Sequence, residues 1–82
     1  MILTDIYVPA LNETYDFQLD ETVPVRLLID EIAGIVQKKA GGIEEAVSHP
    51  FVLCSFEQMR ILVGSKTLRE SGIRNGNALL LV

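Results

Sequence analysis

Residues 68–81 read LRESGIRNGNALLL, a run of turn residues that leads into an uninterrupted apolar segment. Leu68 and Ile73 are two apolar anchors five positions apart among residues that favour turns. The Asn-Gly pair at 75–76 is typical of a tight turn. We therefore expect this stretch to form a compact turn region that leads into a final strand at residues 78–82.

Two segments near the N-terminus predict a β-hairpin. Residues 2–8, ILTDIYV, are rich in β-branched and aromatic side chains and stop at Pro9, which cannot donate a ladder hydrogen bond. The next segment alternates apolar and polar residues with the period of two expected of a half-buried strand. Its apolar members are Tyr15, Phe17 and Leu19. Turn residues at 9–13 connect the two strands.

From Thr22 the apolar spacing changes to three and four, which predicts a helix packed on a flat surface. The apolar stripe comprises Val25, Leu28, Ile29, Ile32, Ile35 and Val36. We expect Thr22 to cap the free amides of the first turn, and Gly41-Gly42 to end the helix. Leu27 and Gly34 fall opposite the stripe, so a leucine and a bare backbone position lie on the face that should be solvated.

A polar loop at 43–50 precedes two further predicted strands, at 51–56 and 59–63. In the first of them the pattern leaves open which side faces the helix, because Val52, Cys54 and Phe56 are as apolar as Phe51 and Leu53. The order strand, strand, helix and three more strands indicates one α+β domain over residues 1–82. We expect a β-grasp, in which one helix packs across one face of a mixed sheet of four to five strands.

Composition excludes several classes of function. The chain has 82 residues, of which 49% are hydrophobic, and its 7 basic against 11 acidic residues give a net charge of −4. This sign disfavours nucleic acid and anionic membrane surfaces as partners. No apolar run is long enough to span a bilayer. We expect a cytoplasmic protein that is held at a membrane only through partner proteins.

The sequence offers little material for catalysis. Cys54 is the single cysteine and His49 the single histidine, so neither a metal site nor a disulfide is predicted. Cys54 would act as a nucleophile only beside a basic partner, and a packing role is favoured. The acidic pairs are interpreted as solubilising; they are Asp20-Glu21, Asp30-Glu31 and Glu44-Glu45. We therefore expect no enzyme activity, no cofactor and no metal.

Three stretches together carry a resemblance to a known family. Residues 14–17 (TYDF), 24–29 (PVRLLI) and 72–77 (GIRNGN) resemble the YukD/EsaB family of ubiquitin-like accessory proteins of type VII (WXG100) secretion. The resemblance implies a ubiquitin-like fold without catalysis, whose last strand lies parallel to the first in the middle of the sheet. It also implies docking on cytoplasmic domains of membrane-bound secretion components.

With that topology, the period of two assigns the two faces of the sheet. The residues expected under the helix are Ile2, Ile6, Val8, Leu79 and Leu81. Leu3, Tyr7, Leu80 and Val82 should lie on the opposite face, which the resemblance makes the candidate docking surface. The alternative is that neighbouring long side chains or a homodimer shield them. Leu27 and Gly34 form a second candidate, for which packing under the 43–50 loop is the alternative.

A different function within the same fold is a ubiquitin-like modifier or a sulfur carrier. Such proteins expose a C-terminal Gly-Gly, whereas this chain ends in Leu79–Val82 and its sole Gly-Gly pair is internal, at 41–42. Conjugation is therefore disfavoured, and a natural chain that continues past Val82 to Gly-Gly would revive it. The free edges of the sheet leave a monomer or a weak homodimer as the expected oligomeric state.

Overall fold

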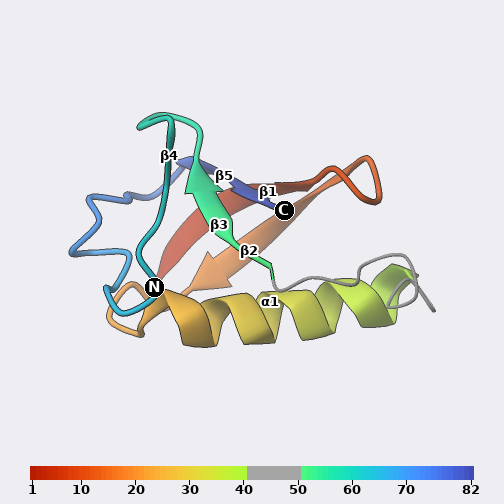
Figure 1. The fold of residues 1–82 in the computed structure, drawn as a ribbon, viewed down its shortest axis with the longest axis horizontal. Helices are drawn as coiled ribbons and strands as arrows, with labels where there is room; N and C mark the ends of the chain where they lie inside the picture. The colour runs from red at the N-terminus through yellow and green to blue at the C-terminus, as the bar shows by residue number, and fades with distance from the viewer. Residues whose placement is uncertain (41–50) are drawn as a thin grey trace.

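The computed structural model describes residues 1–40 and 51–82. It contains one helix and five strands in the predicted order (Figure 1). The elements are β1 (Ile2–Val8), β2 (Glu13–Leu19), α1 (Val25–Ala40), β3 (Leu53–Ser55), β4 (Arg60–Ile61) and β5 (Ala78–Leu81). The predicted α+β ubiquitin-like β-grasp is therefore confirmed. The predictions for Gly41-Gly42, Glu44-Glu45 and His49 lie outside the described residues.

The five strands form one mixed sheet with the order β2-β1-β5-β3-β4. β5 runs parallel to β1, with Ile6 opposite Leu79, and the other neighbours are antiparallel. A parallel pair needs a long connection, and everything between β1 and β5, α1 included, supplies it. The first and last strands therefore meet in the middle of the sheet, as expected.

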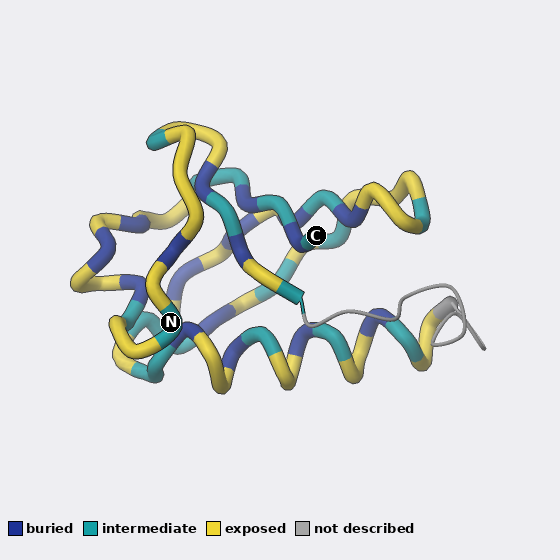
Figure 2. Tube along the Cα trace, viewed as in Figure 1, coloured by how far each residue is buried: buried dark blue, intermediate teal, exposed yellow. Residues whose placement is uncertain are grey.

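The core lies between α1 and one face of the sheet (Figure 2). Val25, Leu28, Ile32 and Val36 of the helix are buried in one cluster with the predicted sheet residues, which are Ile2, Ile6, Val8, Leu79 and Leu81. Ile35 was expected in this cluster and is 37% exposed instead. Its helical position places it at the edge of the stripe, about 100° from Val36 around the axis.

The start of α1 differs from the prediction. Thr22 does not cap the helix: its amide and its hydroxyl both donate to Asp20 Oδ1, at 2.9 and 2.6 Å. The amide of Val25 donates to the carbonyl of Lys66 at 2.8 Å, and that of Arg26 to the carbonyl of Gly64 at 3.0 Å. The first two amides of the helix are thus satisfied by a distant loop, which a local sequence signal cannot indicate, and those of Leu27 and Leu28 donate to the carbonyl of Pro24.

The two short strands are shorter than predicted because the chain turns sharply between them. After β3, the carboxylate of Glu57 accepts hydrogen bonds from the amide of Ala78, at 3.0 and 3.1 Å, and fixes the turn against the start of β5. Leu53 and Ser55 are buried under the helix and Cys54 points the other way. The choice that the sequence left open is therefore settled in favour of the side that carries Leu53.

Candidate docking face

The sheet has one face that the helix leaves uncovered, here called the outer face. The strand registers place five side chains in a row across it, one from each strand. From β2 to β4 this row reads Thr14, Tyr7, Leu80, Cys54 and Ile61. Four of the five are apolar or aromatic and none is fully buried, so the row forms an apolar strip across the sheet.

All four residues predicted for the docking surface lie on the outer face, but they do not form one patch. Tyr7 and Leu80 are direct neighbours in the row. Val82 lies beyond Leu80 and exchanges two backbone hydrogen bonds with Val52, at 2.8 and 3.1 Å. Leu3, 46% exposed, is separated from Tyr7 along β1 by the carboxylate of Asp5. The four residues thus lie on the face that the alternation predicted, with Leu3 apart from the other three.

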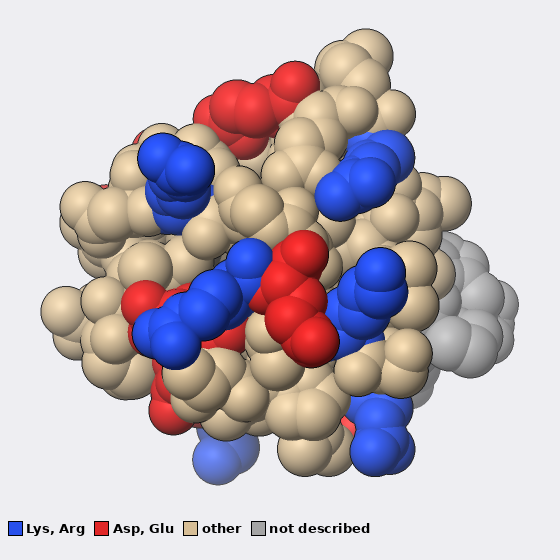
Figure 3. Space-filling model, turned by 90° about the vertical axis from the view of Figure 1, so that its left-hand side faces the viewer, with Lys and Arg blue, Asp and Glu red and all other residues tan. Residues whose placement is uncertain are grey.

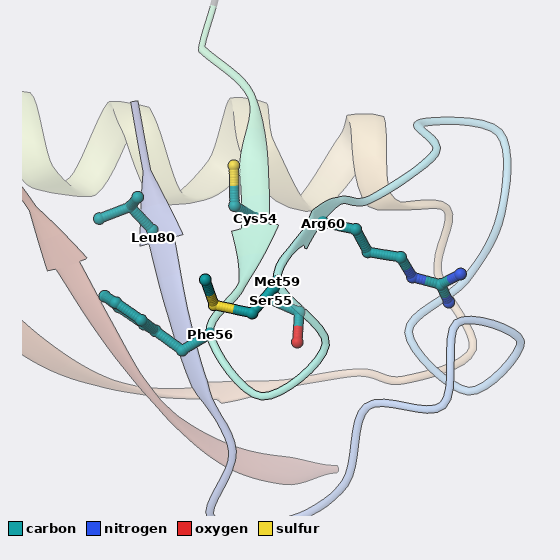
Figure 4. Close-up of a pocket in the computed structure, with 6 residues that line it drawn as sticks. All are labelled: Cys54, Ser55, Phe56, Met59, Arg60 and Leu80. Carbon is teal, nitrogen blue, oxygen red and sulfur yellow. The ribbon is translucent and has the colours of Figure 1, made fainter.

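The apolar surface continues instead toward β3 and β4, through residues that the sequence did not single out. Phe56 is 46% exposed, Ile61 is 62% exposed and Met59 is 84% exposed. Beside them is a shallow hollow of about 260 Å³ lined by Cys54, Ser55, Phe56, Met59, Arg60 and Leu80. In Figure 4, Phe56 and Met59 lie beside each other below Cys54 and Leu80, and the Arg60 side chain extends away from them. An apolar side chain of a partner would fit this hollow.

The backbone at Met59 is strained. Met59 has a φ of 54°, in the left-handed region that residues other than Gly and Asn rarely adopt. The turn between β1 and β2 uses the same conformation at Asn12, φ 52°, where the residue type is suited to it and the side chain accepts a hydrogen bond from the Tyr7 hydroxyl at 3.0 Å. At Met59 the strained turn instead holds a flexible thioether side chain in solvent beside the hollow.

Two carboxylates lie on the outer face next to the apolar row. Asp5 of β1 is directly opposite Asp16 of β2. A hydrogen bond with Asp16 and the repulsion of its charge raise the pKa of Asp5. Like charges directly opposite in a sheet are destabilising. No Lys or Arg within residues 1–40 and 51–82 forms an ion pair with either carboxylate.

Two acidic groups elsewhere, Asp20 and Glu21, have favourable partners. The segment between β4 and β5 and the N-terminus lie at one end of the molecule, where basic and acidic side chains are interleaved (Figure 3). An ion pair of 2.8 Å with the N-terminal ammonium lowers the pKa of Glu21. Hydrogen bonds from Thr22 lower the pKa of Asp20. In the Asp5–Asp16 pair, by contrast, negative charge lies opposite negative charge.

The second predicted site is a bare helix face. Leu27 is 47% exposed, and an added Cβ at Gly34 would meet no atom of residues 1–40 or 51–82 within 4 Å apart from the nearby helix backbone. Both residues therefore lie on the solvated face of α1, as their positions opposite the stripe predicted. The alternative, packing under the 43–50 loop, concerns residues outside those described.

The residues with reactive side chains lie apart from one another in the described part of the chain. Cys54 is half-buried in the outer-face row rather than fully packed in the core. Within the described part of the chain, no group of three or more His, Cys, Asp or Glu side chains is placed to hold a metal ion. Nor does the helix described there have the length and apolar character needed to cross a membrane.

The strand order, the parallel central pair and the single helix define a class of protein: the chain is a ubiquitin-like domain. Three solved structures share its fold at TM-scores of 0.72 to 0.75. It is 19% identical to the EccD5 ubiquitin-like domain from Mycobacterium xenopi, with 99% of this chain and 91% of that chain covered. For the ubiquitin-like domain of the Mycobacterium tuberculosis type VII secretion system protein EccD1, the identity is 19% and the coverages are 100% and 99%.

The third structure is the MycP5-free ESX-5 inner membrane complex. The chain is 17% identical to a chain of that complex, matching over 99% of its own length and 20% of the other's. No curated protein sequence matches this chain. The model of the family "WXG100 protein secretion system (Wss), protein YukD" matches residues 3–81. The chain therefore belongs to the YukD family, and the resemblance seen in the sequence is confirmed.

Proposed function

We propose that this protein is a non-enzymatic interaction module, an accessory or regulatory component of a bacterial type VII secretion system. It docks through its outer face on cytoplasmic domains of membrane-bound secretion components. The observation that carries the proposal is the apolar row on the uncovered face of the sheet, because contiguous exposed apolar surface of this kind marks protein interaction sites.

Family and fold support the choice of partner. The chain belongs to a family of the WXG100 secretion system, and a chain of the ESX-5 inner membrane complex contains a region of the same fold. In that complex the region is a fifth of a larger chain. This chain would bring a domain of the same fold to a secretion machine.

The proposed contacts are centred on Leu80. Tyr7 and Val82 extend the surface along the central strands, and the hollow lies on the other side, toward β4. Leu3 belongs to a separate part of the same face. Leu27 and Gly34 on α1 remain a second candidate surface, which the same experiment tests.

The test is affinity capture from the source cell with three tagged chains: wild type, Leu80→Asp and Leu27→Asp. Each variant replaces one partly exposed leucine with a carboxylate, and the two leucines lie on opposite sides of the molecule. We expect the wild type and Leu27→Asp to retain membrane-bound secretion components, and Leu80→Asp to lose them. Ile61→Asp provides a second outer-face variant at an edge-strand position that is 62% exposed and tolerates the charge better.

Three results would contradict the proposal. Capture of secretion components by both outer-face variants at the wild-type level would remove the outer face from the interaction. Loss only with Leu27→Asp would move the site to the helix. Recovery of an adenylating enzyme in place of secretion components would indicate a carrier or modifier.

A further inference from the structure

The outer face presents two features side by side, an apolar hollow and an uncompensated pair of carboxylates. Leu80 of β5 is paired with Tyr7 of β1, and Asp5 lies two residues before Tyr7 on the same face. Two residues along a strand span about 7 Å. A partner could therefore place one side chain in the hollow beside Leu80 and reach the two carboxylates with a long side chain next to it.

The charge of this face restricts what can cover it. None of the strand residues on the outer face is Lys or Arg; they are Leu3, Asp5, Tyr7, Thr14, Asp16, Gln18, Cys54, Ile61, Ala78 and Leu80. A wholly apolar partner would strip water from two carboxylates without replacing it, which is costly. An acidic partner would add to a repulsion that already raises the pKa of Asp5.

A second copy of this chain does not supply what is missing. Its outer face carries the same two carboxylates and no basic strand residue, and the whole chain has a net charge of −4. Face-to-face pairing would therefore bring together surfaces of like sign. The strand residues of a facing copy therefore offer no basic group, and a partner of different sequence is favoured.

We propose that the outer face binds a protein segment that presents a bulky apolar side chain beside an arginine or lysine. The apolar side chain occupies the hollow between Leu80, Phe56 and Met59, and the cation lies against Asp5 and Asp16. This inference rests on the proposed function and adds the chemistry of the partner. The opposed carboxylates thereby act as a selectivity element, because they are unfavourable until a cation arrives and they repel acidic segments.

The strained turn supports the same site. Met59 keeps a left-handed backbone that a glycine would adopt without strain, and its side chain is 84% exposed at the rim of the hollow. Backbone strain of this kind persists where the surrounding structure enforces it and clusters at functional sites. A methionine side chain can adjust its shape to different apolar side chains. It would close over the apolar residue of the bound segment.

The experiment selects peptides from a phage-displayed random library on the immobilised wild-type chain. Four chains are then compared for affinity toward the selected peptides: wild type, the double variant Asp5→Asn with Asp16→Asn, Leu80→Asp, and a control with Asp30→Asn and Glu31→Gln. The control removes two charges from exposed positions on α1 and matches the net charge of the double variant. We expect the selected peptides to pair a bulky apolar residue with Arg or Lys.

These peptides should bind the double variant about three- to tenfold more weakly, since each exposed ion pair contributes little. The control should bind them as the wild type does, and Leu80→Asp should bind them hardly at all. Peptides without basic residues, no enrichment over the blank support, or equal affinity for the double variant would overturn the inference. If Leu80→Asp abolishes binding but the double variant does not, the partner chemistry is wrong and the outer-face site stands. Binding that survives Leu80→Asp contradicts both.

Discussion

At the scale of single residues, Met59 combines backbone strain with exposure. A left-handed conformation costs a residue with a Cβ roughly 1–2 kcal/mol, whereas glycine adopts it freely. A side chain that is 84% exposed recovers little of this by packing. The residue is therefore better explained by what its side chain offers a partner than by the stability of the turn.

We expect Met59→Gly to raise the free energy of unfolding by up to about 1 kcal/mol, because relief of the strain exceeds the extra entropy of the unfolded chain. Urea denaturation of the purified chain measures the change. Met59→Ala is the matched control, since it removes the side chain and keeps the strain. Equal stability of the two variants would show that the backbone at this position carries no strain worth relieving.

The Asp5–Asp16 pair leads to a prediction about pH. The pKa of Asp5 is raised in the folded state. At a pH between the unfolded and the folded pKa values, the folded chain therefore holds a proton on Asp5 that the unfolded chain has released. The contribution of Asp5 to the stability of the wild type therefore falls as the pH rises through the raised pKa, and the penalty from this pair is complete above it. Asp16 faces Asp5 from β2, and on the β5 side the neighbouring carboxylate is that of Glu57, held on the Ala78 amide.

Asp16→Asn should consequently have a higher Tm than the wild type at pH 7, and this difference should shrink as the pH falls toward about 3, where carboxyls are protonated. Thermal unfolding across that range, with Asp30→Asn of the helix as control, measures it. A Tm at pH 7 no higher than that of the wild type would mean that the two carboxylates do not repel each other appreciably.

At the scale of the elements, two kinds of contact stabilise α1: a buried apolar line along the helix, and hydrogen bonds from its first amides to a distant loop. Its buried line was predictable because the apolar spacing is regular from Val25 to Val36. Its first amides are satisfied by carbonyls of residues 64 and 66, and no pattern near Thr22 could indicate so distant a partner. Contacts set by chain topology are the ones that local sequence signals miss.

Gly34 gives the helix its own prediction. It lies in the middle of α1, where an added Cβ would meet no other described element within 4 Å. We expect Gly34→Ala to stabilise the chain by about 0.5–1 kcal/mol, through the higher helix propensity of alanine. Gly76→Ala should do the opposite, because Gly76 has a φ of 88°. Thermal unfolding of both variants checks this, and a loss of stability with Gly34→Ala would show that this helix face is in contact with another part of the chain.

Strand β3 shows where sequence reasoning about the candidate site reached its limit. Residues 51–56 are apolar at both parities, and the one polar residue, Ser55, points into the core, where its hydroxyl accepts a hydrogen bond from the amide of Gln58 at 3.1 Å. The polarity of Ser55 would have predicted that its side of the strand faces solvent, which is wrong. Because this parity was open, Phe56, Met59 and Ile61 could not be added to the predicted surface. Tyr7 and Leu80 could be assigned to the predicted surface, since the alternation on β1 and β5 is unambiguous once the two strands are neighbours.

At the scale of the whole molecule, one helix covers one face of the sheet and leaves the other free. The covered face holds the core and explains why the chain folds. The uncovered face has an apolar row, a hollow and two opposed carboxylates, none of which the fold requires. Belonging to the YukD family places this surface in a protein of the WXG100 secretion system. The proposal that the outer face is the docking surface is therefore the central claim.

The most direct test is site-specific photo-crosslinking in the source cell, with benzoylphenylalanine introduced at position 59 in one chain and at position 27 in another. Both side chains are exposed, and they lie on opposite sides of the sheet and helix. If the outer face is the docking surface, position 59 forms a crosslink to the cytoplasmic domain of a membrane-bound secretion component, and position 27 forms none. A crosslink to such a component from position 27 alone would contradict it.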